Sequence, residues 1–392
     1  MKTTWMQKRK VDGLALYYLE NPAGQLIYTI KVELFDTVDK EKLEKAVVAA
    51  LDRHSVFKVK LQKGFSTYHY VINSAIFSIQ NRESILNEID FEKNNDFLFN
   101  VSYHENVINF DFFHALTDGA GAKRFLATVM EQYAGFIHSV QDETAEESEN
   151  AYVRHFKSAR IITNLSPSSS FNFEINSDFH VVSFRYNVQD VISLAKENQC
   201  TLTELIVGAF AYATVKTHWE ILAGKTISIA IPVDLRRFYP SNTNNNFTSA
   251  FNCDLAVSGN LDSLAKCVEM TKAQFEEKTG KKHIRRIKKW ANTLEELPLK
   301  PLPLIVKRFL IKASGTGFAP TSNFSNLGII DRENKLADTV KHIDFILPCS
   351  DSLLINFSAC TYGGSLNLNF STLHRNDAFF ALINDVLLGK VV

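Results

Sequence analysis

The sequence predicts an α/β protein made of two α+β sandwich domains, and three observations support this. The chain has 392 residues, which is too long for one ordinary hydrophobic core. Alternating apolar stretches, typical of strands, are mixed with helical stretches in both halves of the chain. A stretch rich in Ser, Pro and Asn at 163–178, TNLSPSSSFNFEINSD, has the composition of a linker. We therefore predict an N-terminal domain over 1–165 and a C-terminal domain over 166–392.

The first half predicts strands, two helices and a hairpin. YTIKVELF (28–35) alternates like a strand, and 38–54 carries Leu43, Val47 and Leu51 on one helical face. Two short strands are expected next, FKVKLQKG and TYHYVINS, with glycine and serine residues at their ends. The stretch 98–113 predicts a hairpin that turns at Glu105-Asn106. An amphipathic helix then begins after residue 118, with Phe125, Leu126, Val129, Met130 and Tyr133 on its apolar face.

The second half repeats this mixture. A helix is expected over 201–219, where TLTELIVGAFAYATVKTHW is apolar enough to be buried, and an amphipathic helix over 261–278. A proline-broken helix at 297–311 and a final helix at 376–388 complete the helical stretches. The expected strands are 181–188, 226–233, 247–257, 322–330, 341–348, 352–360 and 365–372.

Composition excludes several classes of function. The 43 basic and 43 acidic residues balance, so no global field recruits nucleic acid or an anionic membrane. The five cysteines form no C-x-x-C pair, so we expect neither a zinc site nor a disulfide framework. Asp12 and Glu20 interrupt the opening stretch, which argues against a signal peptide, and no apolar run is long enough to span a membrane. We expect a cytoplasmic monomer.

The 30 phenylalanines indicate large aromatic cores or an apolar ligand channel.

The stretch FFHALTDG (112–119) carries the candidate chemistry. His114 lies where an aromatic strand stops, and a histidine there can project into a cleft. The pKa of an unperturbed imidazole, about 6.5, makes it a usable base near neutral pH. An alternative stays open on these residues alone, in which His114 is a satisfied core residue and Asp118 only caps the next helix. A metal site of His104, His114 and Asp118 is not expected, because no third histidine is suitably spaced.

This stretch resembles the HHxxxDG motif of the acyltransferase superfamily that includes chloramphenicol acetyltransferase, plant BAHD acyltransferases, peptide-synthetase condensation domains and alcohol acetyltransferases. Phe113 stands in place of the first motif histidine, and His114 matches the second. IPVDLRRFYPSNTNNNF (231–247) resembles the alcohol acetyltransferase branch, and TSNFSNLG (321–328) is similar to the family's Ser-Asn-x-Gly strand. The DFGWG motif of BAHD enzymes is lacking. The resemblance implies two chloramphenicol-acetyltransferase-like domains with an active-site channel at their interface.

The resemblance also implies roles for particular residues. His114 would be the general base, Asp118 would hold the loop through an ion pair with Arg236, and Gly119 would allow close backbone approach. No covalent acyl-enzyme is implied. The candidates for oxyanion or substrate contacts are Thr248, Ser249, Ser325 and Asn326. Each of these four has an ordinary alternative as a residue of a strand or a strand end.

The implied reaction transfers an acyl group, by the branch resemblance an acetyl group, from acyl-CoA as cosubstrate to the hydroxyl of a small or apolar acceptor, with no further cofactor. KKHIRRIKK (281–289) is either a site for the phosphates of coenzyme A or a solvated helix face. Two alternatives remain. The donor is an acyl carrier protein, as in condensation-type enzymes, or the protein has lost catalysis and only binds, as the replacement at Phe113 suggests.

Overall fold

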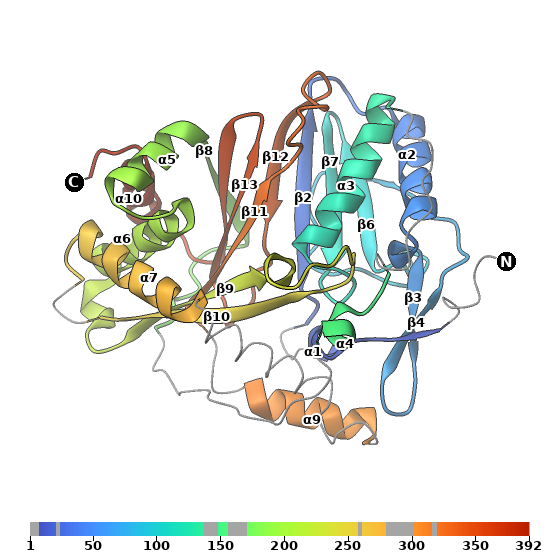
Figure 1. Ribbon diagram of the computed structural model, residues 1–392, viewed down its shortest axis with the longest axis horizontal. Coiled ribbons are helices and arrows are strands. Elements are labelled where there is room, and N and C mark those ends of the chain that lie inside the picture. Colours follow the sequence, from blue (N-terminus) through green and yellow to red (C-terminus); the bar gives the residue numbers. More distant parts are fainter. Residues whose placement is uncertain are drawn as a thin grey trace.

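The computed structural model describes residues 8–20, 24–136, 148–155, 171–257, 261–279, 302–315 and 320–391. It confirms the mixed α/β class, with two lobes that each pack helices on a sheet (Figure 1). The predicted boundary at 165/166 and the basic stretch 281–289 lie outside the described residues. Among the described residues, none of the helices combines the length and the hydropathy that crossing a bilayer requires.

The first lobe contains a five-stranded sheet in the order β12-β2-β7-β6-β5. Helices α2 (Lys40–Arg53) and α3 (Gly119–Ala134) belong to this lobe, and their buried apolar faces join its core. The predicted hairpin is confirmed, because β6 pairs antiparallel with β7 and Glu105 at the turn has a positive φ of 49°. The strands of the sheet are β2 (Ile27–Leu34), β5 (Gln80–Asn81), β6 (Phe99–His104), β7 (Val107–Phe113) and β12 (Val340–Ile346).

Strand β12 comes from the second half of the sequence, yet it pairs antiparallel with β2 in the first lobe. Ile343 and Phe345 are buried in the first-lobe core cluster together with side chains of β2 and β7. The N-terminal lobe therefore needs a strand that lies more than 170 residues beyond the predicted domain boundary. The two lobes are not simply consecutive segments of the chain.

A second small sheet and several short elements surround the lower part of the first lobe (Figure 1). Its strand order is β1-β4-β3, and the 3₁₀ turn η1 precedes β3. Asp12 caps α1 by accepting a hydrogen bond from the Ala15 amide at 2.6 Å. The elements are β1 (Arg9–Lys10), β3 (Val59–Lys63), β4 (Tyr68–Ile72), η1 (Ser55–Phe57), α1 (Gly13–Leu19), α4 (Ala151–His155) and α9 (Leu304–Gly315).

The second lobe is a six-stranded sheet in the order β10-β9-β11-β13-β14-β8. Helix α6 begins with a capping box between Thr201 and Glu204, and its apolar surface is buried against the sheet and α7. The strands are β8 (His180–Asn187), β9 (Thr226–Asp234), β10 (Thr248–Ala256), β11 (Ser322–Ile329), β13 (Ile355–Tyr362) and β14 (Ser365–Thr372). The helical elements are α5 (Val188–Glu197), α6 (Leu202–Leu222), η2 (Leu235–Arg237), α7 (Leu264–Thr279) and α10 (Asp377–Leu387).

Candidate active site

The HxxxDG segment lies at the junction between β7 and α3. The His114 amide donates to the Leu26 carbonyl at 2.9 Å, which is the last backbone bond before the chain leaves the sheet. Four residues later, Asp118 caps α3 by accepting hydrogen bonds from the amides of Ala120 at 3.1 Å and Gly121 at 3.0 Å. The junction predicted from the sequence is therefore present. Asp118 is indeed the helix cap, but capping is only part of what it does.

Two tyrosine rings contact the imidazole of His114, and this residue is partly exposed. The Tyr18 ring of α1 stacks on it with the centroids 4.2 Å apart, and the Tyr28 ring of β2 meets it edge-on at 5.2 Å. Burial lowers the pKa of His114 below its ordinary value, although the negative charge of Asp118 acts in the opposite direction. The imidazole is therefore neutral at pH 7, which is the form that can accept a proton.

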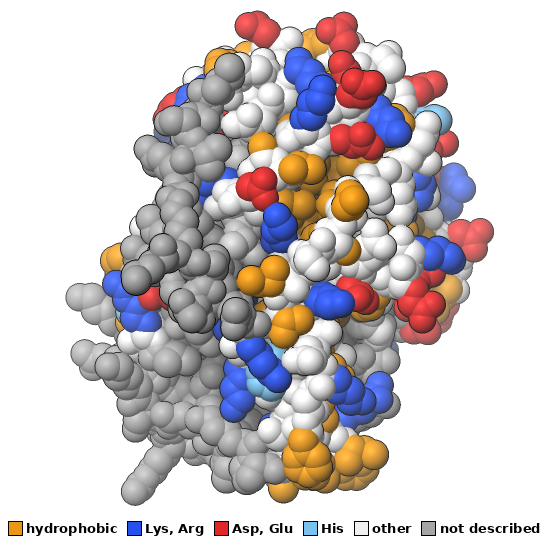
Figure 2. All heavy atoms as spheres, turned by 90° about the vertical axis from the view of Figure 1, so that its right-hand side faces the viewer, with side chains coloured by type: hydrophobic (Ala, Val, Ile, Leu, Met, Phe, Trp, Pro, Cys, Tyr) orange, Lys and Arg blue, Asp and Glu red, His pale blue; other side chains and the backbone are white. Residues whose placement is uncertain are grey.

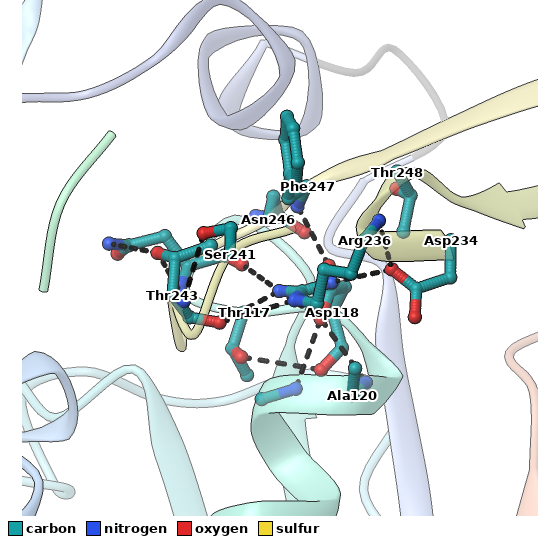
Figure 3. A network of polar contacts seen from close by, with 12 residues as sticks. Thr117, Asp118, Ala120, Asp234, Arg236, Ser241, Thr243, Asn246, Phe247 and Thr248 are labelled. Carbon is teal, nitrogen blue, oxygen red and sulfur yellow. Dashed lines mark hydrogen bonds and ion pairs between the residues drawn. The ribbon is translucent and has the colours of Figure 1, made fainter. Parts of the chain in front are cut away.

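Asp118 forms a buried ion pair with Arg236, as the resemblance implies (Figure 3). Arg236 Nη1 lies 2.9 Å from Asp118 Oδ2, and Nη2 lies 3.3 Å from Oδ1, so the contact is bidentate. The Phe247 amide also donates to Asp118, 2.7 Å from Oδ2. Burial alone would raise the pKa of Asp118, but the Arg236 charge and these hydrogen bonds hold it below its usual value.

Arg236 also organises the segment that follows it. Its guanidinium donates to Asp234 Oδ1 at 3.0 Å and to the carbonyls of Thr243 at 2.9 Å and Asn245 at 2.8 Å. The figure shows the guanidinium between the carboxylates of Asp118 and Asp234 (Figure 3). Because both Asp118 oxygens accept several protein hydrogen bonds, this carboxylate is engaged in structure and is not poised to take a proton.

The loop 241–247 of the second lobe is tied directly to the motif. Thr117 Oγ1 donates to the Asn244 carbonyl at 2.6 Å, and Asn246 Nδ2 donates to the His114 carbonyl at 2.9 Å. Asn246 and Tyr18 are not among the residues that the motif predicts. The only sequence signal for Asn246 is its place in the NTNNNF segment that resembles the alcohol acetyltransferase branch. Nothing in the sequence places Tyr18 beside His114.

Two glycines let these segments approach. A Cβ on Gly119 would lie 2.8 Å from Leu327 Cδ1, the end of a flexible side chain, so the close backbone approach expected at Gly119 lies instead at Gly121. The constraint at Gly121 is much stricter, since a Cβ would lie 2.2 Å from both the Asn244 carbonyl oxygen and Thr117 Oγ1. Gly121 thus allows the Asn244 backbone to approach the start of α3 closely.

Phe113, which replaces the first motif histidine, is buried in the first-lobe core. Its ring centroid lies 6.1 Å from that of Phe91. The Tyr28 ring contacts both Phe112 and His114, whereas the ring contact of Phe113 is with Phe91, so Phe113 and His114 have different neighbours. Phe113 is therefore a residue of the core, and it is not one of the two aromatic rings that contact the His114 imidazole.

The four candidates for oxyanion contacts divide between two faces of the second sheet. Ser249 and Asn326 are on the helical side: Ser249 alternates in phase with the core residue Phe251, and Asn326 Nδ2 donates to Thr203 of α6 at 3.4 Å. Thr248 and Ser325 alternate out of phase with the core and lie on the opposite face. The hydroxyl of Tyr152 holds the Thr248 backbone, 2.9 Å from its nitrogen and 2.5 Å from its oxygen.

No group of three potential metal ligands from His, Cys, Asp and Glu occurs in the described part of the chain. Of the three residues weighed from the sequence, Asp118 is bound to Arg236, and His104 lies with its Nδ1 3.4 Å from Asn81 Oδ1. The arrangement contains one titratable base, one fully engaged carboxylate and nearby hydroxyl groups. This is a set of groups that can move a proton and stabilise a negative charge.

Comparison with known proteins rests on structure. No protein-family model matches the sequence, and no curated protein matches it. Among solved structures, polyketide synthase associated protein 5 from Mycobacterium tuberculosis is similar, with a TM-score of 0.68, 13% identity, and 97% of this chain and 98% of that one covered. The trichothecene 15-O-acetyltransferase of Fusarium sporotrichioides gives a TM-score of 0.66 at 12% identity, with 98% and 96% covered.

The condensation domain of the Monacolin K polyketide synthase is similar as well, with a TM-score of 0.61, 11% identity, and 97% of each chain covered. These matches extend over nearly the whole of each chain, so the likeness includes both lobes and their relative placement. At these identities the likeness establishes the fold and does not transfer an activity. The chain has the two-lobed fold shared by chloramphenicol-acetyltransferase-like acyltransferases and condensation domains.

Proposed function

We propose that this protein is an acyltransferase that moves an acyl group from a thioester to a hydroxyl acceptor, with His114 as the general base. One observation carries the proposal. In the HxxxDG segment, the imidazole is held neutral between two aromatic rings, while the carboxylate four residues later is fully engaged with Arg236. The segment therefore provides one proton acceptor on a rigid support, which is what transfer without a covalent intermediate requires.

In the proposed reaction, His114 removes the proton from the acceptor hydroxyl as its oxygen attacks the thioester carbonyl. The carbonyl oxygen gains the negative charge in the tetrahedral intermediate. When the carbonyl re-forms, the carbon–sulfur bond breaks and the sulfur receives the proton from the imidazolium. His114 returns to its neutral state, so it serves as base and then as acid.

Thr248 and Ser325 are the preferred donors to the developing oxyanion. Both carry hydroxyl groups on the face of the second sheet that is turned away from its helices. The Tyr152 hydroxyl fixes the Thr248 backbone, which favours a preorganised donor. Ser249 and Asn326 are less suited, because burial and the contact with Thr203 direct them toward the helical side.

The surroundings of His114 favour an apolar or aromatic acceptor. Tyr18 and Tyr28 present ring surfaces to the imidazole, and burial raises the pKa of both hydroxyls, so they are neutral. We propose coenzyme A as the carrier of the thioester and acetyl as the acyl group, from the resemblance to the alcohol acetyltransferase branch. A carrier-protein donor is the second candidate, and the fold shared with a condensation domain favours it.

The test is thiol release from a panel of acyl-CoA thioesters, with mixed alcohols and amines as acceptors. Wild type should release thiol in an acceptor-dependent way, and His114→Ala should be slower by about 10²–10⁴-fold. His114→Gln is the matched variant, because it keeps polarity and approximate size without a titratable ring. Equal rates for wild type and both variants contradict the mechanism. If turnover occurs only with an acylated carrier protein, the donor is the carrier protein and not coenzyme A. The proposed role of His114 is unaffected by that result.

A further inference from the structure

Helix α9 and the tip of the β3–β4 hairpin together expose a cluster of large apolar side chains. Phe65 at the hairpin tip is 77% exposed, and Ile305 and Phe309 on α9 are 77% and 72% exposed. Ile305 and Phe309 are four residues apart and so lie on one face of the helix. We call Phe65, Ile305 and Phe309 the α9–hairpin patch. Large apolar side chains that gather on a surface typically mark an interaction site.

The patch is held in place from beneath. The Leu304 amide donates to the Phe65 carbonyl at 3.0 Å, and Lys307 Nζ donates to the Ser66 carbonyl. Leu304 and Lys307 are buried, so this face of α9 packs on the hairpin while the Ile305–Phe309 face is turned outward. The outward face is therefore the result of a defined packing arrangement, and within the described part of the chain Ile305 and Phe309 remain exposed.

Basic residues lie on the side of the patch where the three-stranded sheet adjoins it. Lys10 and Lys63 are exposed on β1 and β3 of the adjoining three-stranded sheet, and Lys8, which precedes β1, is exposed as well. The pKa of Lys307 is lowered by its burial and by the positive charge of Lys10. Figure 2 shows hydrophobic side chains gathered at the lower end of this face, with Lys and Arg side chains above them. The formal charge of the whole chain is zero, so this group of cations is a local feature.

We propose that the α9–hairpin patch binds peripherally to an anionic lipid surface, with Phe65, Ile305 and Phe309 inserted among the lipids and the adjoining lysines against the headgroups. An apolar face rimmed by Lys and Arg is the composition of segments that lie in the membrane interface. Three large side chains on two elements suit shallow insertion. A protein partner of ordinary interface size would require a broader surface.

The patch is coupled physically to the candidate active site through α1. Glu20, at the C-terminal end of α1, is buried, and its carboxylate contacts Arg308 of α9 at 3.0 Å and the Tyr68 hydroxyl of β4 at 2.9 Å. Two residues earlier on the same helix, Tyr18 stacks on His114. A lipid surface bound at the patch would therefore lie on the side of the molecule from which α1 covers His114.

The experiment is flotation of the full chain with vesicles of phosphatidylcholine, alone or mixed with phosphatidylglycerol, in the absence of any acyl donor. Wild type should float with the mixed vesicles and much less with phosphatidylcholine alone. The triple variant Phe65→Ser, Ile305→Ser, Phe309→Ser should bind at least about tenfold more weakly. Lys63→Glu should weaken binding to mixed vesicles about fivefold or more, and added salt should do the same.

Phe35→Ser is the matched control, because Phe35 is a 57% exposed phenylalanine at the end of β2, outside the patch. It should bind vesicles like wild type. Circular dichroism confirms that the variants remain folded. Failure of wild type to float, or equal flotation of wild type and the triple variant, overturns the proposal. If wild type does not float but forms a dimer that the triple variant abolishes, the proposal is also overturned. The patch then binds a second copy of this chain. None of these outcomes bears on thiol release with water-soluble acceptors, so the proposed reaction is tested separately.

Discussion

The protonation state of one side chain, His114, controls the proposed reaction at the residue scale. Burial lowers its folded-state pKa, so the imidazole stays neutral down to a pH below the ordinary value of about 6.5. We expect kcat/KM to fall only as the pH drops through that lowered pKa. The measurement is the pH dependence of thiol release, with His114→Gln as background. An acid limb at or above about pH 6.5 contradicts this prediction.

Tyr18 allows the cause of that shift to be tested. Its ring covers the imidazole at 4.2 Å, so Tyr18→Ala should admit water and move the acid limb upward toward about 6.5. Tyr18→Phe keeps the ring and removes only the hydroxyl, and it should leave the acid limb where it is in wild type. If both variants shift the limb equally, the hydroxyl and not the burial governs the pKa of His114.

The Asp118–Arg236 pair makes a different prediction, about stability. Replacing one partner leaves the other charge buried, so Asp118→Asn should lower the free energy of unfolding by about 3–5 kcal/mol. The folded-state pKa of Asp118 is depressed, so its contribution is full above the unfolded pKa of about 3.9 and is lost as the pH falls through the folded value. Denaturant unfolding of wild type and variant at several pH values measures this. The destabilisation should shrink in acid, and full stability and activity of Asp118→Asn at neutral pH would contradict the structural role.

At the scale of the element, the start of α3 is limited by two glycines of unequal importance. Gly121→Ala would drive a methyl group into the Asn244 backbone and Thr117, so it should cost about 1–3 kcal/mol or more and reduce activity. Gly119→Ala meets only the end of the Leu327 side chain, which can move, and should cost less. Thermal unfolding and thiol release of the two variants give the comparison. If the two variants lose stability and activity equally, the loop 241–247 can move to accommodate a methyl group at position 121.

Sequence patterns predict most elements because local periodicity reports which face of a strand or helix is buried. Strands 28–35 and 226–233 and helices 38–54 and 201–219 are confirmed within a few residues. The Asp118–Arg236 pair could be predicted because both residues lie in recognisable motifs. Tyr18 and Gly121 could not be predicted in their roles. Their importance arises from contacts with segments distant along the chain, and no local pattern records those contacts.

At the scale of the whole molecule, periodicity cannot predict that β12, from the second half of the sequence, joins the sheet of the first lobe. The stretch 341–348 has the alternation of a strand, but alternation does not specify which sheet the strand joins. Its partner β2 lies about 300 residues earlier in the sequence, and Phe345 pairs there with Ile30. Together with the contacts of Thr117, Asp118 and His114 to the loop 241–247, β12 ties the two lobes into one structural unit.

The position of β12 in the first-lobe sheet predicts where a core mutation in the second half of the sequence will act. Ile343 is fully buried in the first-lobe core, so Ile343→Ala should cost about 2–5 kcal/mol and speed amide hydrogen exchange in β2 and β7. Ile355 is equally buried in the second-lobe core, and Ile355→Ala should speed exchange in β14 and β8. Exchange measured by mass spectrometry distinguishes the two patterns. If Ile343→Ala loosens β13 and β14 while β2 stays protected, β12 supports the second-lobe sheet and not the sheet that carries His114.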